Sequence, residues 1–175
     1  MNETLKILEG RRSCRKFIKG KMPSKEDLEA IIRAGTYAAS GMGKQPVKII
    51  AVTNQQVRDA LSKENAKIMG QSADFDPFYG APVVLLVIAD KSSATYIYDG
   101  SLVMGNLMIA AESLGLGNIW IHRAKEEFES EIGKNILKQL GIEGDFEGIG
   151  HVALGYREGE AQKAADRKEN VYWCC

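Results

Sequence analysis

Residues 82–90, PVVLLVIAD, form an unbroken apolar run that constrains the fold more than any other segment. The run is rich in β-branched residues, which favour a strand, and a strand without a polar face must be covered on both sides. Shorter patterns at 47–53 (VKIIAVT), 115–123 (GLGNIWIHR) and 148–156 (GIGHVALGY) indicate three further strands. The chain therefore needs helices packed around a sheet that has at least one fully buried strand.

Helical patterns precede and separate these strands. Leu5 and Leu8 lie on one face of a short helix that Gly10 can end in a left-handed conformation. A second helix is expected to begin after a cap at Ser24 and to end at Gly35. Helices are thus predicted on both sides of the cluster of arginines that follows Gly10.

Two later segments also have helical spacing, and they are expected to end at Gly70 and Gly141. Their apolar positions are Val57, Leu61 and Ile68 in the first, and Phe128, Ile132, Ile136 and Leu140 in the second. The segment from Tyr96 to about Leu114 is nearly apolar all round, which suits a buried helix or one shared with another subunit. Because helices and strands do not alternate strictly, we predict an α+β fold with a mixed sheet.

The composition argues against several classes of partner. Lys and Arg total 23 and Asp and Glu also total 23, so the chain as a whole has no broad attraction for nucleic acid or an anionic membrane. Its apolar segments are too short or too interrupted for a signal peptide or a membrane span. Cys14, Cys174 and Cys175 have no metal-binding spacing, so we expect reduced thiols and no metal. A single domain over residues 1–175 in the cytoplasm is the expectation.

Residues 11–17, RRSCRKF, concentrate positive charge in a neutral chain. In an extended segment Arg11, Ser13 and Arg15 point the same way, and two guanidinium groups with a hydroxyl suit a phosphate. A solvated surface run is the alternative on spacing alone. A nucleic-acid arm fits less well, because Phe17 is the only aromatic residue in the run.

Five segments in order resemble the FMN-dependent nitroreductase family. They are RRSCRKF, AASGMGKQPVKIIAV, the AP before the apolar strand, DGSLVMGNLMIAAESLGLGNIWI, and HVALGY followed by DRKENVYW. The resemblance spans nearly the whole chain and favours the phosphate interpretation of the first segment. It implies a mixed, largely antiparallel sheet surrounded by helices, with an FMN site at a homodimer interface.

The resemblance also implies which residues contact the cofactor. The phosphate contacts map onto Arg11, Arg12, Ser13 and Arg15, completed by Arg167 with Lys168 beside it. The loop that touches the flavin of the partner subunit maps onto Ser40, Gly41, Met42, Gly43 and Gln45. The strand beside flavin N5 maps onto Trp120, Ile121, His122 and Arg123.

Two features qualify this assignment. Relatives commonly have Asn-x-Gln-Pro-Trp where this chain has Gly43, Lys44, Gln45, Pro46 and Val47, so it lacks an amide and a large ring at that edge. His122 is a candidate proton donor, because a free imidazole titrates at about pH 6.5. The alternative is a structural role for this residue.

The implied function is an FMN-dependent oxidoreductase that passes electrons from NADH or NADPH to nitroaromatic, quinone or similar small-molecule acceptors. No G-x-G-x-x-G follows a strand, so a separate dinucleotide-binding domain is not expected. Donor and acceptor would then use one pocket in turn, by a ping-pong mechanism. The alternatives are a specialised flavoenzyme fed by a protein electron donor and a flavin-binding sensor without turnover.

Overall fold

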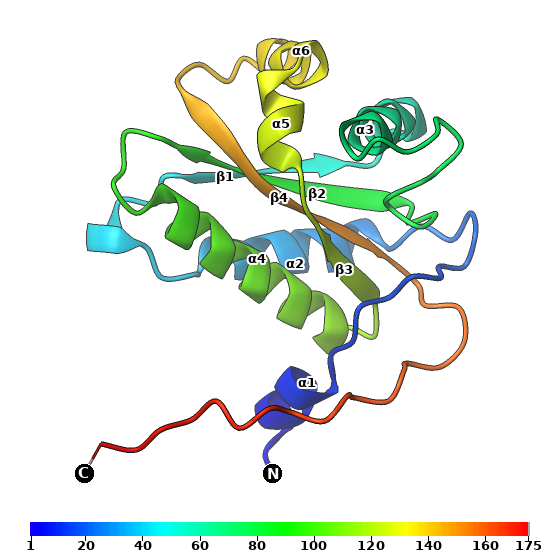
Figure 1. Cartoon of the computed structure of the whole chain (residues 1–175), viewed down its shortest axis with the longest axis vertical. Coiled ribbons are helices and arrows are strands. Elements are labelled where there is room, and N and C mark those ends of the chain that lie inside the picture. Colours follow the sequence, from blue (N-terminus) through cyan, green and yellow to red (C-terminus); the bar gives the residue numbers. More distant parts are fainter. Residues whose placement is uncertain (175) are drawn as a thin grey trace.

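A computed structural model describes residues 1–174 and places four of their strands in one sheet (Figure 1). The strands are β1 (Val47–Val52), β2 (Val83–Asp90), β3 (Gly117–Ile121) and β4 (Phe146–Gly155). Their order is β1-β2-β4-β3, and every neighbouring pair is antiparallel. An isolated parallel bridge joins Ser13 to Asn118 beside β3. The predicted α+β class, with a largely antiparallel sheet, is confirmed.

Helices cover both faces of this sheet. In Figure 1, α3, α5 and α6 lie above it, α2 and α4 lie below it, and α1 lies beyond the end of α4. The bounds are α1 Glu3–Gly10, α2 Lys25–Thr36, α3 Gln55–Ile68, α4 Tyr96–Ser113, α5 Ala124–Glu129 and α6 Glu131–Gln139, with a 3-10 turn, η1, at Gly41–Gly43. Within residues 1–174, none of the helices has the length and apolar character needed to cross a membrane.

Strand β2 is the centre of the core, as its apolar run predicts. Residues 83–89 are all fully buried, and alternate side chains enter two apolar clusters. Leu86 packs in the upper cluster with Phe78 and Phe128, while Leu85 packs in the lower one with Leu107. Strand β2 thus contributes side chains to both apolar clusters.

Gly10 ends α1 as predicted but without the predicted left-handed conformation, and α2 continues one residue past the predicted stop at Gly35. Gly10 is the last residue of α1 and is not left-handed, because the chain leaves the helix at Arg11, which has extended backbone angles (φ −57°, ψ 129°). Gly35 lies inside α2, where a Cβ atom would sit 2.6 Å from Leu107 Cδ2. Gly35 therefore serves the close packing of α2 on α4. Gly70 and Gly141 follow helix ends, as predicted, and both have a left-handed φ.

The single helix predicted through Phe128 and Leu140 is also wrong. The chain forms α5 and α6, which are separated by the extended residue Ser130. A Cβ at Gly133 would lie 2.4 Å from Phe128 Cα, so the glycine allows α6 to fold back closely on α5. Leu140 is 55% exposed and lies just past the last residue of α6.

Two glycines in β4 allow the end of β3 and the start of α5 to approach the sheet. A Cβ at Gly148 would lie 2.1 Å from the carbonyl oxygen of Ala124, and one at Gly150 would lie 2.7 Å from Trp120 Nε1. The register of β2 against β4 shifts between these glycines, which is where a bulge fits. The G-I-G of the last strand thus positions the segment that follows β3.

The C-terminal segment runs over the surface without a regular element after the bridge between Phe17 and Arg157. The aromatic residues Tyr172 and Trp173 are 91% and 88% exposed. In the single chain, residues 171–173 thus do not bury their aromatic surface. Cys174 is exposed, and Cys175 lies outside the described residues.

Candidate functional site

The arginine segment is attached to the edge of β3. The backbone N–H of Cys14 donates to the carbonyl of Asn118 over 2.9 Å, beside the parallel bridge from Ser13. Cys14 and Phe17 are buried and Arg15 is exposed, so the backbone is fixed while the charged groups face outward. The local fold therefore presents the cluster on the surface at the β3 end of the sheet.

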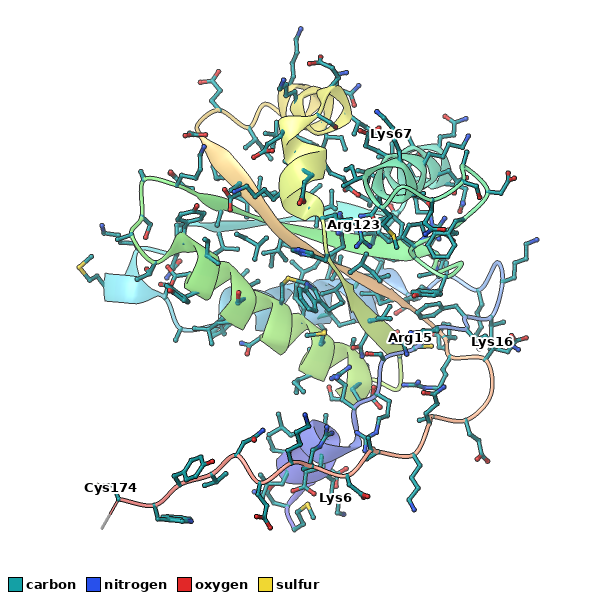
Figure 2. All side chains as sticks on the ribbon, in the orientation of Figure 1. Lys6, Arg15, Lys16, Lys67, Arg123 and Cys174 are labelled. Carbon is teal, nitrogen blue, oxygen red and sulfur yellow. The ribbon has the colours of Figure 1, made fainter. Side chains whose placement is uncertain are left out.

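A cavity of about 270 Å³, here called the arginine cavity, lies between this segment and the C-terminal tail. The predicted phosphate residues that line it are Arg11, Arg12, Ser13, Arg15 and Arg167, together with Gln162, Lys163, Ala164 and Ala165. The cavity thus lies between the two ends of the chain and is lined by Arg167, whereas Lys168 is not part of the lining. Figure 2 shows Arg15 where the N-terminal segment passes near the tail.

Two guanidinium nitrogens in the cluster are buried without a hydrogen-bond partner among residues 1–174. These are Arg11 Nη1 and Arg12 Nε. Arg12 Nη1 is occupied, because it donates to the carbonyls of Glu9 (2.6 Å) and Arg11 (2.8 Å) at the end of α1. Buried donors are almost always paired, so the free nitrogens indicate a missing acceptor. The phosphate of FMN fits this donor set.

The predicted flavin loop has an unusual backbone. Met42, Gly43 and Gln45 all have positive φ, at 53°, 66° and 48°. Ser40 Oγ accepts from the backbone N–H of Gln45 over 3.1 Å, which closes the loop around η1. Met42 is 84% exposed, so the loop projects from the body of the chain.

This loop lies far from the arginine cluster within one chain. The backbone N–H of Gly41 donates to Asp99 Oδ1 in the first turn of α4. At the other end of α4, Glu112 Oε2 accepts from Arg157, which also donates weakly to the carbonyl of Arg12. With a rise of about 1.5 Å per residue, Asp99 and Glu112 are about 20 Å apart along the axis. Figure 1 shows η1 and the N-terminal segment at opposite ends of α4.

A second cavity, of about 210 Å³, lies under the loop where the sequence departs from its relatives. Val47 and Ile49 form part of its wall, with Ser40, Gln45 and Asp99 at its polar side. Both Asp99 oxygens are occupied, by Gly41 N–H and by the Thr95 hydroxyl at 2.9 Å. The small Val47 side chain is consistent with the open space at this edge.

The third predicted group lies at the end of β3. Trp120 is 53% exposed and its ring centre is 5.8 Å from that of His122, whose side chain is also exposed. Ile121 is buried in the upper core. Arg123 has a φ of 78°, and its Nε donates to Asn65 Oδ1 over 2.9 Å. In Figure 2 Arg123 lies between the start of α5 and α3, away from Arg15.

The fold and this surface together define an α+β protein with an antiparallel sheet and, at the edge of β3, a cluster of charged donors whose chemistry suits a phosphate. The chain belongs to the nitroreductase family, whose model matches residues 8–156. The predicted family resemblance is therefore confirmed.

Individual relatives agree with this membership. A candidate NADH dehydrogenase/NAD(P)H nitroreductase of Archaeoglobus fulgidus is 30% identical over 91% of this chain and 88% of its own length. The oxygen-insensitive NADPH nitroreductase of Salmonella typhimurium is 29% identical over 81% of this chain, which spans 65% of that protein. A Bacteroides fragilis nitroreductase with bound FMN superposes with a TM-score of 0.86 and 27% identity, and the match covers 100% of both chains. These matches support the prediction that the chain is an oxidoreductase.

Sequence reasoning missed several residues around these groups. Gln162, Lys163, Ala164 and Ala165 line the arginine cavity, although the polar tail carries no pattern that marks them. Asn65 was also missed, because a polar residue in an amphipathic helix is normally assigned to the solvent face.

Proposed function

We propose that this chain is an FMN-dependent oxidoreductase that passes electrons from NADH or NADPH to nitroaromatic, quinone or similar small-molecule acceptors. The main support is the arginine cavity, where an unpaired buried Arg11 nitrogen and four other predicted residues meet. A neutral chain gains little from gathering this charge unless it holds an anion. Family membership favours FMN as the phosphorylated ligand of this cavity.

Each residue of the cluster has a distinct part in holding the phosphate. The guanidinium groups of Arg11 and Arg15 supply charged donors, and the Ser13 hydroxyl lies between them in the sequence. Arg12 holds the end of α1 through Nη1 and keeps its Nε for the ligand. Arg167 closes the cavity from the tail, which is why the C-terminal segment matters for binding.

The complete site requires a homodimer. The loop at residues 40–45 and the arginine cluster lie at opposite ends of α4, so the loop of one chain can reach only the flavin held by its partner. Tyr98 and Leu102 on α4 are 72% and 51% exposed, and the apolar residues 171–173 are exposed as well. A second copy would cover these surfaces and bring its own loop to the cavity.

At the end of β3, the backbone of residues 120–123 would hold and orient the edge of the flavin. The chemistry that FMN supplies when bound is two-electron transfer, first from NADH or NADPH and then to the acceptor, in a ping-pong sequence. Trp120 and His122 present their exposed rings on the same segment and can contact the exchanging substrates. Electron transfer at the flavin needs no acidic side chain from this segment. The reaction would take place in the cytoplasm, where NADH and NADPH are available.

The test is the visible spectrum of the purified protein before and after anaerobic addition of NADH or NADPH. A bound flavin band that bleaches, and returns when a quinone is added, supports the proposal. Protein that binds FMN but stays oxidised with both nucleotides would instead support the sensor or the enzyme with a protein donor. Failure to take up FMN at all would contradict the proposed function.

A further inference from the structure

A buried polar network lies behind the end of β3. Glu127 from α5 and His151 from β4 are both fully buried, and Glu127 Oε2 is 2.6 Å from His151 Nε2. Asn65 from α3 is equally buried and donates its Nδ2 to Glu127 Oε1 over 2.5 Å. Polar groups cost free energy to bury unless they are paired. Three elements that meet through such groups inside an apolar core therefore require an explanation.

The hydrogen positions in this network follow from its acceptors. His151 Nδ1 lies 3.1 Å from the carbonyl oxygen of Ile121, which can only accept, so Nδ1 carries a hydrogen. Without a further proton, lone pairs of Nε2 and of Glu127 Oε2 would face each other at 2.6 Å. One proton therefore lies between Glu127 and His151, and the pair has no net charge.

The network holds the turn between β3 and α5 at three points. His151 holds the carbonyl of Ile121, and Asn65 Nδ2 also donates to the carbonyl of His122 over 3.1 Å. Asn65 Oδ1 accepts from Arg123 Nε, so the amide of Asn65 uses both its donor and its acceptor atoms. Arg123 has a left-handed φ of 78°, a conformation that a residue with a side chain keeps only where its surroundings impose it.

We propose that Asn65, Glu127 and His151 are positioning residues that direct the backbone N–H groups of residues 120–123 toward the flavin edge. The inference rests on the proposed function, which places this segment beside flavin N5. N5 accepts a hydrogen bond in oxidised flavin and carries a hydrogen in reduced flavin. A directed N–H therefore favours the oxidised form, whereas a general loss of stability would weaken the binding of both forms by the same factor.

The first test compares Asn65→Ala with the control Ser62→Ala. Ser62 lies one turn earlier on the same buried face of α3, but it donates to Asp76 Oδ1 over 2.7 Å and is outside the network. The measurement is the dissociation constant of oxidised and of reduced FMN for each protein. Asn65→Ala should change the ratio of the two constants by about threefold to tenfold, the effect of one misplaced hydrogen bond, and Ser62→Ala by less than about twofold. Equal weakening of both forms by Asn65→Ala would overturn the inference.

Two further variants keep the test decisive if Asn65→Ala does not fold. Arg123→Gly accepts the left-handed backbone without strain and removes the contact with Asn65. Like Asn65→Ala, it should therefore weaken the binding of oxidised FMN more than that of reduced FMN. Glu127→Gln can still accept from Asn65 and can donate to a neutral His151, so it should keep the wild-type ratio. A wild-type ratio in Arg123→Gly, or a shifted ratio in Glu127→Gln, would contradict the network's role.

A readout that needs no flavin separates this inference from the proposed function. The chain has two tryptophans, so an amide-correlation spectrum shows two indole signals, which a Trp173→Phe variant assigns. Trp120 lies beside the turn, and Trp173 lies in the exposed tail. Asn65→Ala should move the Trp120 signal and leave that of Trp173 in place, with no movement of either in Ser62→Ala. An unmoved Trp120 signal would overturn the inference, whereas a wild-type protein that binds no FMN would contradict only the proposed function.

Discussion

The backbone N–H of Gly41 donates to Asp99 Oδ1 over 3.0 Å, and this bond fixes the loop at residues 40–45 to the first turn of α4. The carboxylate is 3% exposed and also accepts from the Thr95 hydroxyl. A Cβ at Gly41 would lie 2.2 Å from Thr95 Oγ1, so only glycine allows the loop to pass this close to the helix. The start of the loop is therefore held against the first turn of α4.

Assembly is expected to depend on the exposed face of α4. Leu102→Glu places a charge on a surface that the partner should cover, so it should shift the protein toward monomers and lower its flavin content. Leu140→Glu is the matched control, because Leu140 is similarly exposed but lies at the end of α6, above the sheet. Light scattering at micromolar concentration measures the mass. A flavin-loaded monomer of the wild-type chain would refute the shared site.

Binding of the phosphate is expected to depend on Arg15. Arg15→Ala removes one charge-assisted contact, which should weaken FMN binding by about 1.5 to 3 kcal/mol, from about tenfold to more than a hundredfold, without unfolding the chain. Riboflavin has no phosphate and should bind the wild type and the variant equally. Lys16→Ala removes a neighbouring charge that pairs with Glu158 and does not line the cavity, so it should leave FMN affinity unchanged. Equal losses for FMN and riboflavin would argue against the assignment.

The tail is expected to act through Arg167 in preference to Lys168. Arg167 lines the cavity and Lys168 does not, so Arg167→Ala should weaken FMN by about tenfold while Lys168→Ala should have little effect. Truncation after Ala165 should release the flavin and abolish NAD(P)H oxidation while the core stays folded. Limited proteolysis with and without FMN checks the same contact. A truncated protein that keeps its flavin would show that Arg167 is a solvated surface residue and does not bind the phosphate.

Stability in acid is expected to depend on Asp76. Burial raises the pKa of its carboxyl, but hydrogen bonds from Arg58, Ser62 and Gly80 outweigh this effect and hold the pKa below its ordinary value of 3.8. A group with a lowered pKa stabilises the fold above its unfolded pKa, and this contribution is lost as the pH falls through the folded value.

Asp76→Asn should therefore lower the free energy of unfolding by about 1 to 3 kcal/mol at neutral pH, with a smaller difference from wild type below about pH 4. Urea denaturation at several pH values measures this dependence. Asp74→Asn is the control, because Asp74 is exposed and lies two residues away. A difference between Asp76→Asn and wild type that stays constant from pH 7 to pH 3 would rule out the carboxylate as its source.

The strands and most helices could be predicted from the sequence because their signals are local. The apolar run of β2 and the pattern of α4 need only neighbouring residues to be recognised. The resemblance to the family added the arginine cluster and Arg167, which no periodicity connects. Gly35 was misjudged because its purpose, close contact with Leu107, depends on a helix far along the chain.

The buried network could not be predicted for the same reason. Asn65, Glu127 and His151 come from three elements, and each looks like an ordinary polar residue on its own helix or strand. On α3, the polar residues Arg58, Ser62 and Asn65 repeat at helical spacing, which normally marks a solvated face. Here that face is buried, because Asp76 and Glu127 provide its partners.

The separation that α4 imposes also has a genetic consequence. In a mixed dimer, one subunit can carry Arg15→Ala and the other a damaged loop at residues 40–45. The damaged arginine cluster then faces the damaged loop in one site, while the second site receives both intact halves. If the proposed homodimer forms, the two defective proteins should therefore restore up to about half of the wild-type sites per mixed dimer when they are expressed together, as two defective alleles complement each other in one cell.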